Sequence, residues 1–517
     1  ALTDADYNVA VGRSALTNDT LGARNVAVGW SALSSQNFTS TTTSYNVGLG
    51  FQAGNQITIG TNNTLVGSLA GDALTDSDRN AVLGYNALGQ ETLGQYNVAV
   101  GYAALATQNN TSATNVYNVA VGYNAGGAIT TGFNNTAIGG LALDAQTTGD
   151  YNVALGTLAL SADTTGNKAT GLGYGALAAQ NVTDSSDTFN TAVGYTAGAA
   201  ITTGTQNTFV GGLTGDGATT ASGNNAFGYN ALGATCTGGN NQAFGVGALN
   251  ANTSGEGNIG IGLNALFANT GADLNIAIGT GALDAFNVSS GDTYNVAIGD
   301  QAGGAMTTGI QNTLIGGLAG DALTDADFNV ALGVAALGAD TLGSHSVAIG
   351  TYALAAQNNT SATNTYNVAV GSSAGTSITT GTGHTLIGGL AGDSLTTGLG
   401  NTAVGTNALG GETTGRYNVA IGENALKDQN FSGSNNVYNT AVGRMAGESV
   451  TTGVQNTLIG GLAGDLLTDA DFNVAIGASA LSGDTLGSKS IAIGQGALST
   501  QNFTSATDSF NTAVGHN

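Results

Sequence analysis

Residues 97–151 hold three successive versions of one segment: NVAVGYAALATQNNTSATNVY (97–117), NVAVGYNAGGAITTGFN (118–134) and NTAIGGLALDAQTTGDY (135–151). Each opens with a motif of Asn, three small or apolar residues and Gly. The motif recurs 29 times along the chain, in most cases at the spacing that separates Asn118 from Asn135. Such a fixed period is typical of a solenoid, whose coils are each too small to bury a core alone. The sequence therefore predicts an all-β parallel β-solenoid (β-roll) of about 29 rungs built from 17-residue coils.

Within each motif, the residue types predict a short strand that is apolar on both faces. The residue before the glycine is large and apolar in every copy, and the residue two positions earlier is mostly Val, Thr or Ile. The residue between them is usually Ala and points the other way. A strand that is buried on both faces requires a second covering layer. We also expect the asparagines to form a hydrogen-bonded ladder and each glycine to turn the chain where a Cβ would clash. A second strand and a second turn would complete a flattened coil.

Composition narrows the classes of protein that fit. Hydrophobic residues make up 41% of the 517 positions and sit at fixed places in the repeat, which argues against disorder. Proline is absent, as a stack of hydrogen-bonded strands favours. Cys236 is the single cysteine, so no intrachain disulfide is possible, and we expect a buried small side chain there. The net charge of -24 argues against a nucleic-acid partner. No apolar run is long enough to span a membrane.

A second, 72-residue period is superimposed on the first, because the intervals group as 17, 17, 17 and 21. Each longer coil adds a polar stretch, and insertions in solenoids bulge on one face and often carry function. All seven longer coils contain Asn-x-Ser/Thr, the acceptor pattern for N-glycosylation. The candidate loop contacts or glycan acceptors are therefore Asn37, Asn109, Asn181, Asn287, Asn358, Asn430 and Asn502.

Other chemistry-bearing residues give no catalytic, cofactor or metal site. Asp72, Asp76 and Asp78 share one turn, echoed at Asp321, Asp325 and Asp327 and at Asp465, Asp469 and Asp471. Such a turn could hold Ca²⁺, but a solvated acidic turn that discourages aggregation is the favoured interpretation. The histidines His345, His384 and His516 share no register. Aromatic residues that precede many motifs (Tyr7, Tyr96, Tyr151, Phe328, Tyr417) could stack on sugars, but packing at a corner is favoured.

The motif Asn295–Gly299, NVAIG, resembles the head repeat of trimeric autotransporter adhesins, and the resemblance covers essentially the whole chain. It implies a left-handed parallel β-roll made of three identical chains, although those heads have shorter coils. The segment Asn401–Leu409, NTAVGTNAL, is similar to repeats in tail-fibre-like proteins of marine bacteriophages, which the longer coil favours. The trimer is also supported by the apolar outer strand face, which a lone solenoid would expose as a long stripe.

These observations lead us to expect a structural protein, not an enzyme, with residues 1–517 forming one repetitive shaft. The favoured function is the shaft of a viral tail fibre or appendage that displays a receptor-binding tip. The alternative is a bacterial surface adhesin or extracellular filament that binds matrix or glycans. Both place the chain outside the cell, on a virion or a cell surface, with itself as partner in a homotrimer and a surface glycan or receptor as a further partner. The chain lacks an initiator Met and opens in mid-repeat, so we expect a segment of a longer fibre protein.

Overall fold

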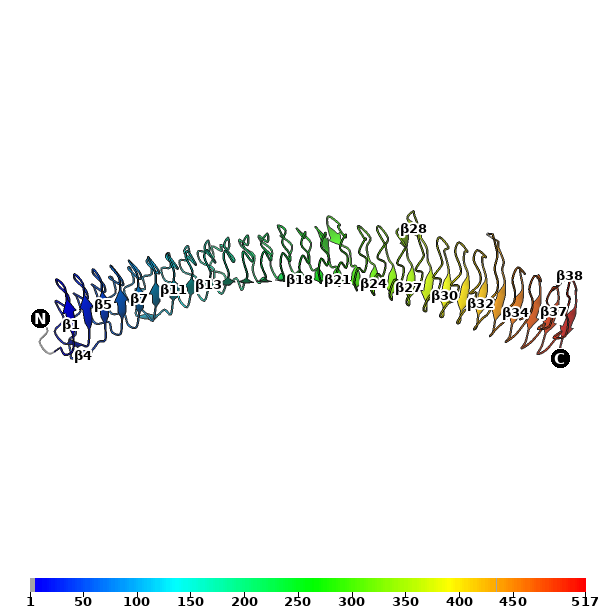
Figure 1. Ribbon diagram of the computed structural model, residues 1–517, viewed down its shortest axis with the longest axis horizontal. Helices are drawn as coiled ribbons and strands as arrows, with labels where there is room; N and C mark the ends of the chain where they lie inside the picture. The colour runs from blue at the N-terminus through cyan, green and yellow to red at the C-terminus, as the bar shows by residue number, and fades with distance from the viewer. Residues whose placement is uncertain (1–4, 434) are drawn as a thin grey trace. The chain divides into compact units, whose positions relative to one another are not determined.

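The computed structural model describes residues 5–433 and 435–517, and the regular elements in these ranges are all β-strands. The chain forms two compact units, Ala1–Gly257 and Asn258–Asn517. Figure 1 shows that, within each unit, successive coils stack in the order of the sequence. Each unit is therefore a parallel β-solenoid, as the repeat predicts.

The first unit contains one three-residue strand per coil. These strands are β1 (Val9–Val11), β3 (Val26–Val28), β5 (Val47–Leu49), β6 (Thr64–Val66), β7 (Ala81–Leu83), β9 (Val98–Val100), β11 (Val119–Val121), β12 (Thr136–Ile138), β13 (Val153–Leu155), β14 (Thr170–Leu172), β15 (Thr191–Val193), β16 (Thr208–Val210), β17 (Asn225–Phe227) and β18 (Gln242–Phe244).

The second unit repeats this arrangement. Its strands are β19 (Ile259–Ile261), β21 (Ile276–Ile278), β23 (Val296–Ile298), β24 (Thr313–Ile315), β25 (Val330–Leu332), β27 (Val347–Ile349), β29 (Val368–Val370), β30 (Thr385–Ile387), β31 (Thr402–Val404), β32 (Val419–Ile421), β33 (Thr440–Val442), β34 (Thr457–Ile459), β35 (Val474–Ile476), β37 (Ile491–Ile493) and β39 (Thr512–Val514).

Neighbouring strands pair in parallel with equivalent residues opposite one another. Ala99 of β9 lies opposite Ala120 of β11, which in turn lies opposite Ala137 of β12. The central residue of the strand faces the interior, where these alanines are almost completely buried. A second alanine, three residues after the motif glycine, is also buried, as at Ala104. Thr214, which takes its place in one coil, is buried too and donates a hydrogen bond to the carbonyl of Gly228.

The predicted second strand is wrong for most coils. After the motif glycine the chain forms turns, because every second residue has a left-handed backbone: Ala103 has φ 55° and Leu105 has φ 51°. An extended strand needs negative φ at each residue, so this wall cannot be a regular sheet. It is still bonded from coil to coil, for example from the Leu88 amide to the Ala104 carbonyl (2.9 Å). The leucine side chains of this wall fill the core.

Within residues 5–433 and 435–517, short second strands form only beside longer coils. In each case two residues of a longer coil pair in parallel with two residues of the coil before it. The pairs are β2 (Gly22–Ala23) with β4 (Thr42–Thr43), β8 (Gly94–Gln95) with β10 (Thr114–Asn115), β20 (Ala272–Asp273) with β22 (Gly291–Asp292), β26 (Gly343–Ser344) with β28 (Thr363–Asn364), and β36 (Gly487–Ser488) with β38 (Thr507–Asp508).

The motif asparagines form the predicted ladder inside the corner. Asn135 is buried, as are its equivalents other than Asn8 and Asn511. The Asn135 amide donates to Oδ1 of Asn118 (2.8 Å), and Oδ1 of Asn135 accepts from the Asn152 amide (2.9 Å). The Asn135 side-chain nitrogen donates to the carbonyl of Gly149 (2.8 Å). The ladder thus satisfies backbone groups that the turning chain leaves free inside the stack.

Candidate functional surfaces

The outer face of the main sheet is an exposed surface of each unit whose third strand position is apolar in every coil. The first and third residues of every strand point away from the core, and they are partly or fully exposed. We call these two rows of side chains the wall stripe. In β7 and β13, for example, Leu83 is 50% exposed and Leu155 is 46% exposed. The sequence predicted an apolar outer face, and the part of the chain that the structure describes provides no layer that covers it.

Two further rows of side chains lie beside the wall stripe. The leading column is the residue immediately before each motif asparagine, and the trailing column is the residue immediately after each motif glycine. In the trailing column Tyr85, Tyr102 and Tyr123 stack with ring centroids 5.4 and 5.6 Å apart. In the leading column Tyr96 and Tyr117 stack at 5.0 Å. Rings stacked in this way cover one another's faces, so they favour packing at a corner over the stacking of sugars.

Cations occupy the leading column at four positions, of which Arg24, Lys168 and Lys489 directly precede a longer coil and Arg79 does not. Arg24 lies over the rings of Tyr7 (5.8 Å) and Tyr45 (5.6 Å) on either side of it. Lys168 lies 5.2 Å from the ring of Phe189 and forms an ion pair with Asp187 (2.5 Å). These exposed contacts are each worth about 0.5–1 kcal/mol. In these coils the leading column therefore combines aromatic and cationic side chains.

The seven candidate asparagines lie at the start of the polar stretches and not at their tips. Six are exposed, and Asn181 is half-buried. Each Oδ1 accepts a hydrogen bond from a threonine hydroxyl of the preceding coil, for example from Thr92 to Asn109 (3.0 Å). The six equivalent pairs are Thr20–Asn37, Thr164–Asn181, Thr270–Asn287, Thr341–Asn358, Thr413–Asn430 and Thr485–Asn502. These asparagines thus continue a row of threonines across the longer coils.

A buried carboxylate anchors the longer coil in six of the seven cases. Oε1 of Glu91 accepts from the amides of Gly94 (2.7 Å) and Asn110 (3.0 Å), and Oε2 accepts from Nε2 of Gln108 (2.7 Å). Oε1 of Gln108 in turn accepts from Nδ2 of Asn118 in the ladder (2.8 Å). The six buried acids are Asp19, Glu91, Asp163, Asp340, Glu412 and Asp484. Burial raises the pKa of Asp163, although its hydrogen bonds oppose that shift.

Sequence reasoning missed this anchor, yet the signal is present. Six anchoring glutamines each stand one coil after a buried acid, at Gln36, Gln108, Gln180, Gln357, Gln429 and Gln501. In the seventh longer coil Asn269 and Phe286 stand at these two positions, and both are buried. An acid and a glutamine one coil apart at interior positions therefore mark the anchor.

The acidic turns do not gather into a metal site. Oδ1 of Asp78 accepts from the backbone amide (2.6 Å) and hydroxyl (2.9 Å) of Thr61 in the preceding coil, and Asp327 and Asp471 make the equivalent contact to backbone amides. Over residues 5–433 and 435–517, no three His, Cys, Asp or Glu side chains form a group that could hold a metal ion. Asp72 lies half-buried, and desolvation raises its pKa.

The three histidines and Cys236 likewise lie apart in structural positions. His384 replaces a ladder asparagine and is buried: Nε2 lies 2.9 Å from the Gly398 carbonyl, and Nδ1 accepts from the Asn401 amide (3.3 Å). Burial lowers its pKa from 6.5 to about 4. His345 packs between Phe328 and Tyr366. Cys236 is buried, as predicted, and burial raises the pKa of its thiol.

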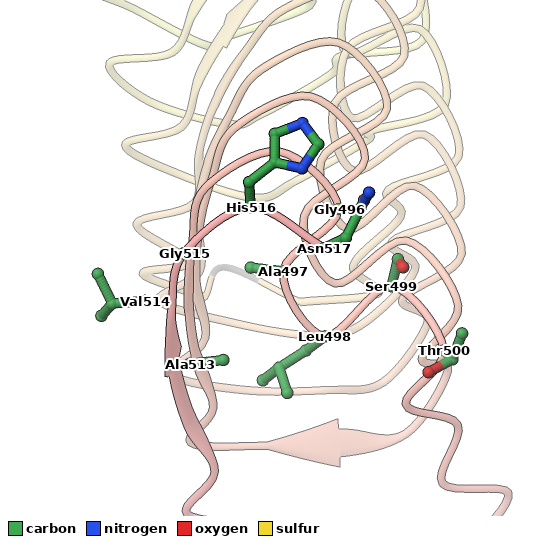
Figure 2. Close-up of a pocket in the computed structure, with 10 residues that line it drawn as sticks. All are labelled: Gly496, Ala497, Leu498, Ser499, Thr500, Ala513, Val514, Gly515, His516 and Asn517. Carbon is green, nitrogen blue, oxygen red and sulfur yellow. The ribbon is translucent and has the colours of Figure 1, made fainter.

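A hollow of about 620 Å³ lies at the last coil of the second unit. Figure 2 shows Ala513 and Leu498 pointing into the space inside this coil, whereas Val514 points away from it. The hollow is thus the interior of the last coil seen from its end. Val514 shows how the wall stripe faces outward from every coil.

Comparisons with known proteins found no matching family model and no matching curated protein. A separate search of the described residues for a helix long and apolar enough to cross a membrane found none. The assignment of a function therefore rests on the surfaces of the chain.

Proposed function

We propose that this chain is a structural fibre segment: the shaft of a viral tail fibre or similar appendage, which extends and displays a receptor-binding tip. Three copies would associate through their wall stripes. The chain would act outside the cell, as part of a virion. Its role would be mechanical. Each coil is held by the coils on either side, and the number of coils sets the length of the shaft.

The exposed wall stripe is the observation that carries this proposal. The third strand residue is apolar in every coil and exposed or half-buried in the lone chain. Apolar patches on soluble monomers rarely exceed a few hundred Å², and larger ones mark interaction sites. A stripe of this kind on each unit is suited to a partner with the same repeat, which is another copy of the chain.

The longer coils support the alternative, an adhesin or extracellular filament on a bacterial surface. Their polar stretches expose small hydroxyl and amide side chains, such as Thr111, Ser112 and Asn115. Such groups recur with each longer coil and could bind a glycan weakly at many points, which adds up through effective concentration. In this alternative the seven asparagines lie beside the contact surface.

Immunogold electron microscopy of the natural source separates the two functions. Antibodies raised against the recombinant chain should label the appendages of virus particles if the chain is a fibre shaft. Labelling along the envelope of bacterial cells would favour the adhesin instead. Labelling confined to the cytoplasm would contradict both, because each requires the chain to be displayed outside a cell.

A further inference from the structure

The two flanking columns carry information about how copies of the chain meet. In every coil the leading and trailing residues stand six positions apart, on opposite sides of the wall stripe. A chain of six extended residues spans at most about 20 Å. They are therefore separated within one chain by the width of the wall, and no packing within the coil requires their types to match.

Nevertheless, cationic and aromatic residues match across the two columns of the first unit; in the second unit Arg444 shares its coil with Tyr438, whereas Lys489 shares its coil with Gln495. In the first unit the leading residues Arg24, Arg79 and Lys168 share their coils with the trailing residues Trp30, Tyr85 and Tyr174, and the leading Tyr7 shares its coil with Arg13. All eight side chains are exposed. Each cation of the two columns in this unit thus has an aromatic residue at the opposite edge of the same coil.

The second coil after a longer coil shows a related match, here between small or polar residues. Its trailing residue is Gly140, Gly212, Gly317, Gly389 or Gly461 in five of six cases. The leading residues of these coils are Asn134, Gln206, Gln311, Gly383 and Gln455. Bulky aromatic residues are absent from both edges of these coils.

Nothing within the chain requires glycine at these trailing positions. None of the five has a positive φ. A Cβ at Gly140 would meet no atom within 4 Å, and at the other four its nearest contact would lie at 3.8 Å or beyond. A glycine that is needed neither for its backbone conformation nor for room inside its own chain indicates close approach by something outside it.

Resting on the proposed function, we infer that the copies associate in parallel and in register, with the leading column of one copy against the trailing column of the next. Copies related by rotation about an axis parallel to the solenoid bring opposite edges together. In register, Arg79 of one copy contacts Tyr85 of the next copy. Asn134 of one copy then enters the open space beside Gly140 of the next, where no side chain stands. A shift by one coil would instead place Asn134 against a tyrosine or threonine.

The available surface is large enough for this assembly. The first unit has 14 main strands, so at about 4.8 Å per step its wall is roughly 60 Å long. With a width of up to about 20 Å, the wall and its two edges offer on the order of 1,200 Å². A stable interface needs about 800 Å² from each partner.

Cross-linking of the full chain tests the register. In a Cys236→Ala background, Asn134→Cys/Gly140→Cys places both thiols in one coil. The matched control Asn134→Cys/Gly212→Cys uses the same residue types but places them four coils apart. That offset is roughly 19 Å along the stack, beyond the reach of a short bis-maleimide. Each single-cysteine variant controls for links between like positions.

We expect the same-coil pair to give covalently closed trimers on a denaturing gel and the offset pair to stay monomeric. Gln206→Cys/Gly212→Cys should repeat the result, and it replaces the first pair if that variant does not fold. Sedimentation of the same samples separates the two hypotheses. A trimer in which only the offset pair links, or neither pair links, overturns the register but leaves the proposed assembly. A folded monomer overturns both.

Discussion

At the scale of single residues, the fold depends on positions that only one residue type can fill. Gly101 has φ 133°, and a Cβ there would lie 2.3 Å from the carbonyl oxygen of Gly122 in the next coil. The positive φ and the lack of room for a Cβ both require glycine here, because the corner that turns the chain also lies against the backbone of the next coil. The motif glycine is therefore required for the stack itself, unlike Gly140.

Gly101→Ala should accordingly be far more harmful than the same change at Gly140. We expect Gly101→Ala to destabilise the stack by about 3 kcal/mol or more, from backbone strain and a backbone clash. Gly140→Ala should change stability by less than about 0.5 kcal/mol in the dissociated chain. Chemical denaturation followed by circular dichroism measures both. Equal costs at the two positions would contradict this account of the corner.

His384 provides a pH test of the buried ladder. Since folding lowers its pKa from 6.5 to about 4, the neutral ring's contribution is complete above pH 6.5 and is lost as the pH falls toward 4. The loss corresponds to at most about 3 kcal/mol. The protection factors of amides around residues 380–405, which correct exchange for its intrinsic pH dependence, should therefore fall over this pH range.

His384→Asn restores the residue found at 25 of the 29 equivalent positions. This variant should remove the acid-dependent fall in protection while leaving protection at pH 7 nearly unchanged. A variant that keeps the full pH dependence would show that the ionisation of His384 is not its cause.

At the scale of elements, each longer coil is held by a carboxylate, not simply inserted as a loose bulge. Glu91 accepts six hydrogen bonds from the turn that follows it and from the longer coil. A buried carboxylate without a nearby cation is stable only when its oxygens are fully bonded. The anchor thus explains why the extra residues of this coil begin in one fixed conformation.

Glu91→Gln should loosen the longer coil that follows it. The amide nitrogen of the new side chain would face donors, so we expect a loss of about 2–4 kcal/mol in local stability. Faster hydrogen exchange and protease cleavage within residues 109–116 would register the change. Glu423→Gln makes the same substitution at an exposed side chain outside this anchor and should leave exchange and cleavage within residues 109–116 unchanged. An unchanged longer coil in Glu91→Gln would show that the anchor is dispensable.

The sequence was sufficient to predict the elements that repeat in every coil. The strand at Val98–Val100, the buried ladder at Asn118 and the closed corner at Gly101 all follow from period and residue type. The second wall was not predictable in the same way, because Leu105 favours extended or helical backbone when it stands alone and adopts φ 51° only within the stack. The Glu91 anchor was missed because its residues lie one coil apart in the sequence. The acid and the glutamine also recur with the same 72-residue period as the longer coils, so they do not stand out as a separate pattern.

At the scale of the whole molecule, the account rests on how the wall stripe is covered. The inner face of each strand is filled by small side chains such as Ala99, whereas the outer face presents large ones such as Leu83 to solvent. Polar side chains at these outer positions would keep a single solenoid soluble. The proposed association with identical chains would cover this apolar outer face.

Trp30, the single tryptophan, reports on that contact. It lies in the trailing column, is 44% exposed in the lone chain and packs 4.7 Å from the ring of Phe51. Association should shield it, so its fluorescence should shift to the blue and resist quenching by iodide. Dilution below the association range should reverse both changes. Fluorescence that stays independent of concentration in a sample shown to associate would place Trp30 outside the interface.

The most direct test of the central claim is the mass of the folded chain in solution, measured by sedimentation equilibrium of the whole protein. Covered wall stripes predict a species of three times 50.3 kDa, stable over a wide range of concentration and formed by protein with the circular dichroism of β-structure. A soluble, folded monomer of 50.3 kDa would contradict the claim, because its wall stripe would then remain exposed without a partner.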